Sequence, residues 1–435
     1  MRKLLLILTA CLFAVGPMIG VAGAHVRLDR SYGQNGYVSV QPPLPAPWQT
    51  QYIRDMAAAH DGDSFALFER QRCAGSCSSS NSLFRYLGDG SLDPDFGGSD
   101  GSYELPSEGE GIPALAVDSQ GRPLIAQVST DHAVIRRLTS SGAPDPSFGA
   151  EGTVALQCNC EYGGTRIVPG RRGMVTVVFS RGRYGQGPTG YARTGTVFTA
   201  VRLEANGSED ARFGKGGSST FGLRGAEPFA AATTSKGGAL YLGGAGCCGF
   251  DIPGYVVRVS ARGRFDRRFT AATRHSLQAI RRLGSLQESI NAVLVRPRGN
   301  IDLIGAAGYE RGFVLRLNRS GHRHREFGHH GLRVLPVPVA SAVLGSDGST
   351  LAVSDESARG VDLLMRILEG GRLDRAFGNP GASIARSVGD FGLSVVHQVG
   401  RRALVLDRGE KECRGYCPAD PKLVRFLEVS APKRR

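Results

Sequence analysis

The chain has 435 residues, a net charge of +14, 61 glycines and a single tryptophan, Trp48. Apolar residues make up 41% of it, which is enough to bury a core. The composition is that of a globular protein with many turns, and it favours an all-β fold over a helical one. After the first 24 residues, no apolar stretch is long enough to span a bilayer.

The first 24 residues have the pattern of a secretory leader. Arg2 and Lys3 precede an apolar run from Leu4 to Val21, and Ala22-Gly23-Ala24 supplies a small-residue cleavage signal. We expect cleavage after Ala24 and a secreted, periplasmic or cell-surface protein. A transmembrane anchor and a lipoprotein attached at Cys11 are the alternatives; the second is disfavoured because the apolar stretch before Cys11 is very short.

Removing the leader leaves 51 basic and 39 acidic residues, a net charge of +12. Two interpretations of this excess stay open: attraction to anionic polymers or surfaces of the cell envelope, and a spread of solvated arginines on strand faces. Nucleic acid is not expected as a partner, because the chain has no reader motif and no aromatic platform. The basic residues form no long run; examples of adjacent ones are Arg171-Arg172, Arg267-Arg268, Arg401-Arg402 and Lys433-Arg434-Arg435.

A short motif recurs seven times along the chain. Each copy ends in an aromatic residue, and successive aromatics lie 50 to 65 residues apart. An acid stands three residues before the aromatic except at His324, and a glycine follows the aromatic except at Thr270. The seven aromatic residues are Tyr32, Phe96, Phe148, Phe213, Phe269, Phe327 and Phe377.

Upstream of six motifs the pattern continues. A glycine lies six residues before the aromatic and predicts a tight turn, and an arginine eleven residues before it lies in an alternating apolar stretch typical of a strand. The glycines are Gly90, Gly142, Gly207, Gly263, Gly321 and Gly371. The arginines are Arg85, Arg137, Arg202, Arg258, Arg316 and Arg366.

The first motif lacks its arginine strand, and residues 423–426 near the C-terminus supply such a strand without a motif. We therefore expect Arg425 to lie beside Tyr32 and the two chain ends to close a ring. The expected order in each unit is a strand after the motif glycine, a hairpin, and the arginine strand as fourth. No segment shows a sustained helical period. The prediction is a single seven-bladed β-propeller of four-stranded antiparallel blades over residues 25–435.

The pattern Arg-Leu, Gly, Leu-Asp-x-x-Phe-Gly resembles the delta-60 repeat of bacterial secreted and surface proteins, over nearly the whole chain after the leader. The resemblance implies an exported bacterial β-propeller and brings no catalytic residues with it. Tyr32, Thr270 and His324 depart from the pattern.

We interpret the motif residues as structural. The aromatic residue is expected to pack between blades, the glycine to allow a turn into the next inner strand, and the acid to bind backbone amides or the strand arginine. No cofactor is expected; calcium is an alternative that one acid per blade supports only weakly.

Eight cysteines follow the leader in four close pairs, which favours disulfides in an exported protein. All four pairs are expected on one face, opposite the motifs. Cys73–Cys77 and Cys413–Cys417 are the preferred local bridges. Cys158/Cys160 and Cys247/Cys248 are awkward local partners, so cross-blade bridges between these two pairs and a vicinal disulfide stay open, with metal binding as a less favoured alternative.

The cysteine-bearing face also carries the longest loops, expected to be irregular. One is 181–193, where Arg181, Arg183, Tyr184, Tyr191 and Arg193 form a candidate binding loop, and another is 407–421. A disordered hairpin tip over 181–193 is an alternative that stays open. We expect a monomeric binding protein whose ligand is an envelope polysaccharide or a protein. An enzyme acting on a glycan or small molecule at the central channel is the alternative. Other propeller signatures, such as repeated tryptophan docking motifs, are absent.

Overall fold

The computed structural model describes residues 26–428, apart from residues 41, 45, 60, 75, 99, 108–112, 159, 161–164, 188–189, 224–225, 234–237, 247–253, 284–287, 355–362, 376, 378–381, 385–392, 400–401 and 408–421. The predicted leader lies outside these residues. Among the described residues, no helix is both long and apolar enough to cross a membrane.

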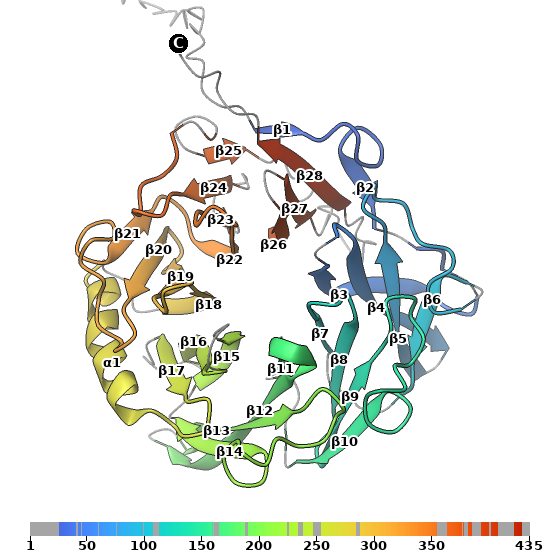
Figure 1. The fold of residues 1–435 in the computed structure, drawn as a ribbon, viewed down its shortest axis with the longest axis horizontal. Helices are drawn as coiled ribbons and strands as arrows, with labels where there is room; N and C mark the ends of the chain where they lie inside the picture. Colours follow the sequence, from blue (N-terminus) through green and yellow to red (C-terminus); the bar gives the residue numbers. More distant parts are fainter. Residues whose placement is uncertain are drawn as a thin grey trace, which may run out of the picture.

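The described strands form seven antiparallel sheets arranged around a centre, a seven-bladed β-propeller as predicted (Figure 1). Blade 1 contains β3 (Thr50–Ala58), β4 (Ser64–Ala74), β5 (Ser76–Tyr86) and β6 (Ser102–Leu105). Blade 2 contains β7 (Ala114–Val117), β8 (Pro123–Val128), β9 (His132–Arg137) and β10 (Thr153–Gln157). Blade 3 contains β11 (Arg166–Pro169), the 3-10 turn Arg171–Gly173, β12 (Val175–Gly187), β13 (Gly190–Leu203) and β14 (Ser218–Leu223).

Blade 4 has three strands, β15 (Ala226–Thr233), β16 (Leu240–Gly246) and β17 (Tyr255–Val259), followed by the helix α1 (Arg267–Arg281). Blade 5 contains β18 (Glu288–Val295), β19 (Ile301–Ala307), β20 (Arg311–Leu317) and β21 (Leu332–Leu335). Blade 6 contains β22 (Val339–Leu344), β23 (Thr350–Ser354), β24 (Leu363–Ile367) and β25 (Ala382–Ile384). The closing blade joins β26 (Leu393–Val399), β27 (Arg402–Asp407) and β28 (Lys422–Glu428) to β1 (Val26–Leu28) and β2 (Tyr37–Ser39).

The closing blade confirms the expected ring closure. β28, near the C-terminus, pairs with both β1 and β2, with Leu28 opposite Phe426 and Tyr37 opposite Val424. In Figure 1 the blue N-terminal strands lie beside the red C-terminal strands. Pairing the two ends of the chain covers the edge that an open ring would expose.

The expected strand order within a blade is wrong by one position. The arginine strand is the third strand, and the strand after the motif glycine pairs with it as the outermost strand of the same blade, as β13 pairs with β14. The motif glycine therefore turns the chain back along its own blade and does not lead to the next inner strand. Sequence spacing cannot distinguish these orders, because both give the same repeat length.

The helix α1 is a second departure from expectation. It begins within the motif that has Thr270 in place of glycine, and it packs against β17 and β20 on the rim of blade 4 (Figure 1). At five described motifs the glycine has a positive φ of 50° to 78° and reverses the chain: Gly33, Gly97, Gly149, Gly214 and Gly328. A β-branched threonine strongly disfavours that conformation, so the chain continues as a right-handed helix capped by Asp266.

The core is a series of apolar layers between neighbouring blades. One layer joins Leu124 and Ile135 of blade 2 to Val175 and Val177 of blade 3, with Phe148 fully buried among them. This confirms that the motif aromatic packs between blades. Each sheet buries both faces in this way, so the blades support one another around the ring.

Candidate binding face

The motif residues form a clamp between consecutive blades. Arg137 of blade 2 binds Asp145 of its own motif at 2.7 Å, lies 4.5 Å from the centre of the Phe148 ring, and donates to the carbonyl of Ala205 in blade 3 at 2.8 Å. Burial raises the pKa of Asp145, but hydrogen bonds from Ser147 and the charge of Arg137 outweigh it and hold the pKa below its ordinary value. One guanidinium thus satisfies groups on two blades.

The same clamp recurs around the ring. In six blades the arginine donates to a backbone carbonyl of the following blade; the pairs are Arg85 to Ser140, Arg137 to Ala205, Arg202 to Ala261, Arg258 to Arg319, Arg316 to Glu369 and Arg425 to Gly88. Five of these guanidinium groups lie 4.0 to 4.7 Å from the centre of the motif ring. The motif is therefore scaffold, as interpreted from the sequence.

Blade 5 shows how the clamp tolerates a missing acid. His324 occupies the acid position, and Arg316 instead binds Asp302 on the neighbouring strand β19 at 2.6 Å. Arg296 also pairs with the buried Asp302 and donates to it at 2.7 Å. In this blade the carboxylate that binds the arginine therefore comes from another strand, and the guanidinium of Arg316 still lies over the Phe327 ring.

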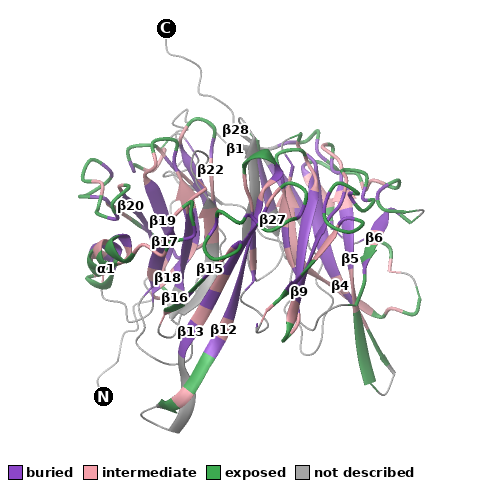
Figure 2. Cartoon of the chain, turned by 60° about the horizontal axis from the view of Figure 1, so that its bottom comes forward, coloured by how far each residue is buried: buried purple, intermediate pink, exposed green. Residues whose placement is uncertain are grey.

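The loops opposite the motifs carry two hairpins that project beyond the blades (Figure 2). β4 and β5 have 11 residues each, and β12 and β13 have 13 and 14, whereas the described second and third strands of the other blades have five to seven. At about 3.3 Å per residue, the excess extends each hairpin by roughly 15–25 Å. We call this end of the propeller the loop face, and the opposite end the motif face.

The candidate binding loop is a regular hairpin, not the irregular loop that its sequence suggested. Arg181 pairs with Val197, and the ladder continues through a bulge at Arg183/Tyr184 to Gly187 opposite Gly190. Arg183 and Tyr184 are exposed, Tyr184 by 53%. Tyr191 and Arg193 belong to β13, and their side chains lie outside the described residues. Consecutive residues of a strand point to opposite sides, so Arg183 and Tyr184 do not share one surface of the hairpin.

The cysteine predictions are confirmed at one pair and wrong at another. Cys73 and Cys77 form a disulfide near the tip of the β4–β5 hairpin, as preferred. Cys158 bonds Cys160 directly, although a one-residue spacer was expected to disfavour this. The pair follows β10, the outermost strand of blade 2. Cys247, Cys248, Cys413 and Cys417 lie outside the described residues, as does 408–421 of the second predicted loop.

Two aromatic residues of the loop face, Tyr309 and Trp48, are not among the predicted binding residues. Tyr309, in the turn between β19 and β20, is 71% exposed. Trp48 lies just before β3, with the guanidinium of Arg72 5.9 Å from the ring centre, and Gln49 beside it accepts a hydrogen bond from the Cys73 amide at 3.0 Å. In the sequence, Tyr309 is followed by Glu310 in a short turn between two apolar strands, and this pattern is a signal for an exposed aromatic side chain.

Polar side chains of the inner strands bind backbone groups of the next blade. Asp55, beside a bulge in β3, accepts from the amide of Leu115 on β7 at 2.9 Å. Asn291, at the bulge of β18, donates to the carbonyl of Val339 on β22 at 2.7 Å. Among the described residues, no three His, Cys, Asp or Glu side chains gather as metal ligands do.

Glu288 is the one strongly perturbed carboxyl of the described inner strands. Its side chain is 2% exposed, and Arg281 of α1 lies 3.8 Å from its Oε1 atom. Neither carboxyl oxygen makes a hydrogen bond of ordinary geometry with a described residue, although the Gly254 amide lies close enough to favour the charged form slightly. Burial raises its pKa to about 7, against the opposing charge of Arg281.

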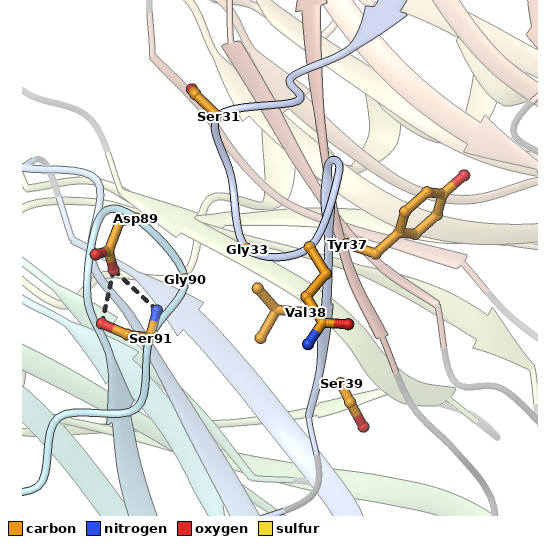
Figure 3. A pocket seen from close by; sticks show the side chains of 9 residues that line it. Ser31, Gly33, Tyr37, Val38, Ser39, Asp89, Gly90 and Ser91 are labelled. Atoms are coloured by element: carbon orange, nitrogen blue, oxygen red, sulfur yellow. Dashed lines mark hydrogen bonds between the residues drawn. The ribbon is translucent and has the colours of Figure 1, made fainter.

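A shallow cleft of about 860 Å³ lies on the motif face at the ring closure (Figure 3). It is formed by the first motif and the turn of blade 1, and Asp89 on its wall accepts from the amide and hydroxyl of Ser91 at 2.9 and 2.7 Å. Tyr37 points away from the Asp89 turn. The Asp89 carboxylate therefore stabilises the turn that contains it, through the amide and hydroxyl of Ser91.

Comparison with known proteins identifies no family for this chain. No family model and no curated protein matches the chain. Similar solved structures include the AfRom2 CNH domain, with 10% identity, a TM-score of 0.46, and coverage of 90% of this chain and 99% of that one. The polysaccharide lyase Uly1 gives 10% identity, a TM-score of 0.46 and coverage of 94% and 98%. Prolyl oligopeptidase B from Galerina marginata gives 10% identity, a TM-score of 0.46 and coverage of 88% and 52%. At such scores the likenesses carry no functional argument, and the propeller assignment rests on the sheets themselves.

Proposed function

We propose that the protein is an exported, non-enzymatic β-propeller that binds a cell-envelope ligand, a polysaccharide or a protein, through its loop face. One observation carries the proposal: the β4–β5 and β12–β13 hairpins both project from this face, far beyond the ends of their blades. A strand pair that leaves the core buries little apolar surface there, so its length is not explained by stability.

The side chains of the loop face suit recognition. Tyr184 and Tyr309 are two of the three large apolar side chains that are exposed in the described part of the chain, and both belong to this face. Tyrosine offers a flat apolar surface and a hydroxyl at small entropic cost, which favours it in binding sites for sugars and proteins. The Cys73–Cys77 bridge holds the two strands of the other hairpin together near its tip.

The test is to shorten the β12–β13 hairpin. Replacing residues 183–195 by Asn-Gly joins Gly182 to its ladder partner Thr196 through a two-residue turn. Binding to immobilised cell-envelope polysaccharide and to intact cells is expected to fall at least tenfold, since the deleted residues include Tyr184. The point variant Tyr184→Ala is expected to lose part of the same affinity.

The melting temperature is the control for this deletion. The removed segment lies beyond the ladder that β13 forms with β14, which starts at Thr196, so the shortened protein is expected to melt within a few degrees of the wild type. Unchanged binding by the folded deletion and by a Tyr309→Ala variant would contradict the proposal.

A further inference from the structure

The positive charge of the chain is concentrated in one sector. Residues 260–334 contain fifteen arginines, no lysine and five acidic residues, a net charge of +10 out of +14 for all 435 residues. The sector comprises the motif turn of blade 4, helix α1 and blade 5. Arg267-Arg268 and Arg281-Arg282 are the adjacent pairs here, and the other arginines of the sector are spread singly along its sequence.

Nine exposed arginines of this sector lie in the turn 260–264, on α1 within 267–274, and in the turns 296–300 and 318–326 of blade 5. None of the nine forms an ion pair with an acid of the described residues. The acids of the sector do not offset them: Asp266 pairs with Arg258, Glu288 and Asp302 are buried, and Glu310 lies on the loop face. Glu326 is the one exposed acid of residues 260–334 on the motif face, among the described residues.

Hydrogen bonds join these turns into one surface on the motif face. Arg258 of blade 4 donates to the carbonyl of Arg319 at 2.5 Å, and Arg319 donates to the carbonyl of Arg298 at 2.7 Å. Ser276 of α1 donates to the carbonyl of Gly321 at 2.9 Å. Figure 1 shows α1 on the rim beside β17 and β20. We call this surface the basic rim.

Two arginines of the basic rim stand where they do not help the fold. Arg267 and Arg268 occupy the first turn of α1, which contains no acid. The amino end of a helix carries a partial positive charge, so cationic side chains there oppose the helix dipole. A charge that is unfavourable for its own helix points to a role outside the folded chain.

We propose that the basic rim binds an acidic polysaccharide, one that carries carboxylate or sulfate groups along its chain. Arginine is suited to this ligand because its planar guanidinium donates two parallel hydrogen bonds to one carboxylate or sulfate. A row of arginines over two neighbouring blades can follow successive acidic groups of an extended polymer. The site is independent of the loop face, which lies at the other end of the blades.

The same surface fits a nucleic acid or a membrane less well. Phe269 and Phe327 are buried and Phe265 is half-buried, so these aromatic rings do not form a platform on which bases stack. The apolar side of α1, with Leu277 and Ile280, is packed inside the blade layer and leaves no anchor for a bilayer.

The experiment compares two variants of equal charge. In the rim variant R267Q/R268Q/R323Q/R325Q, affinity for polygalacturonate and for heparin is expected to fall at least tenfold at low salt. The slope of log K against log salt is expected to decrease by about two or more. The control variant R30Q/R171Q/R172Q/R375Q removes four exposed arginines from other blades of the motif face and is expected to bind nearly as the wild type does. The two probes distinguish a carboxylated from a sulfated ligand.

The melting temperature shows whether a variant loses binding because it has lost arginines or because it has unfolded. R267Q/R268Q alone is expected to melt at the same or a higher temperature than the wild type, because it removes charges that oppose the helix dipole, while it weakens polygalacturonate or heparin binding. Equal losses in the rim and control variants would overturn the proposal, as would no binding of either polysaccharide at about 50 mM salt. Tighter binding to a DNA duplex or to phosphatidylcholine/phosphatidylglycerol vesicles than to either polysaccharide would also overturn it.

Discussion

At the residue scale, the turn glycine that lies six residues before the motif aromatic contacts the backbone of the preceding blade so closely that no side chain fits there. Gly263 has a φ of 72°, and a Cβ atom built on it would lie 2.3 Å from the amide nitrogen of Gly214. Gly142 and Gly207 would meet the amides of Gly97 and Gly149 at 2.5 and 2.7 Å. The turn of one blade therefore rests directly on the motif backbone of the previous one.

This contact predicts unequal costs for two similar substitutions. Gly121 has a φ of 75°, but a Cβ atom added there would have no neighbouring atom within 4 Å, so Gly121→Ala is expected to cost only the roughly 1–2 kcal/mol of a left-handed alanine. Gly263→Ala adds a clash with immobile backbone and is expected to cost about 1–3 kcal/mol more. Chemical denaturation of both variants measures the difference; equal losses would show that the blades separate easily here.

The buried Glu288 predicts a pH dependence of stability. Its pKa is about 7 in the folded protein and near 4.5 when unfolded, so between these values the folded state binds the extra proton. Stability from this group is thus complete below about pH 4.5, falls as the pH rises to about 7, and is flat above.

Glu288→Gln is expected to remove this decline. Above pH 7 the wild type buries a carboxylate charge and the variant does not, so the variant is expected to be more stable by about 1–3 kcal/mol. Melting curves between about pH 5 and 8 are the measurement. A wild type and variant that change in parallel with pH would contradict the buried-acid account.

At the element scale, the two long hairpins belong to the least stable parts of the molecule. Residues 76–79 of β5 are exposed, and the disulfide Cys73–Cys77 closes only a short loop near the tip. Constraining a short loop removes little entropy from the unfolded chain, about 2 kcal/mol at most. The bridge therefore holds the hairpin in shape and contributes little to the ring.

The double variant Cys73→Ser/Cys77→Ser tests whether the disulfide holds only the hairpin and not the ring. Hydrogen exchange at the amides of residues 71–79 is expected to accelerate at least tenfold, while the exchange of β8 and β19 and the melting temperature change little. A large fall in melting temperature would mean that the hairpin supports the whole propeller.

At the scale of the whole molecule, the ring closes through a few residues of the N-terminal segment. Asp29 accepts from Arg425 at 2.7 Å and is 2% exposed, and β1 and β2 both pair with β28. Tyr32 packs under Arg425, with 4.4 Å between the guanidinium carbon and the ring centre. These contacts repeat the clamp of the other blades across the two ends of the chain.

Removing residues 26–40 is expected to open the ring. The deletion exposes β28 as an unpaired edge and uncovers Leu423, so the product is expected to melt at least about 10 °C lower or to associate through that edge. Thermal unfolding measures the change in melting temperature, and light scattering detects association of the truncated chains. A variant Asp29→Asn keeps the strands and is expected to lose about 3 kcal/mol, as a broken buried ion pair does. A truncated chain that stays monomeric with an unchanged melting temperature would show that the closure contributes nothing.

The repeat, the seven blades and the ring closure were all predictable from the order of residues, because each blade repeats the same Arg, Gly and aromatic residue to meet the same neighbour. A periodic pattern leaves other features open, and these depend on contacts in three dimensions. The arginine strand is third in its blade, and pairing partners are not encoded in spacing. The helix that contains Thr270, the regular strand pairing within 181–193 and the local Cys158–Cys160 bond also appear only in the folded chain. Folding gathers arginines from separate turns of two blades into one surface, which only proximity in space can do. The exported location and the ligand remain predictions from the leader, the loop face and the basic rim.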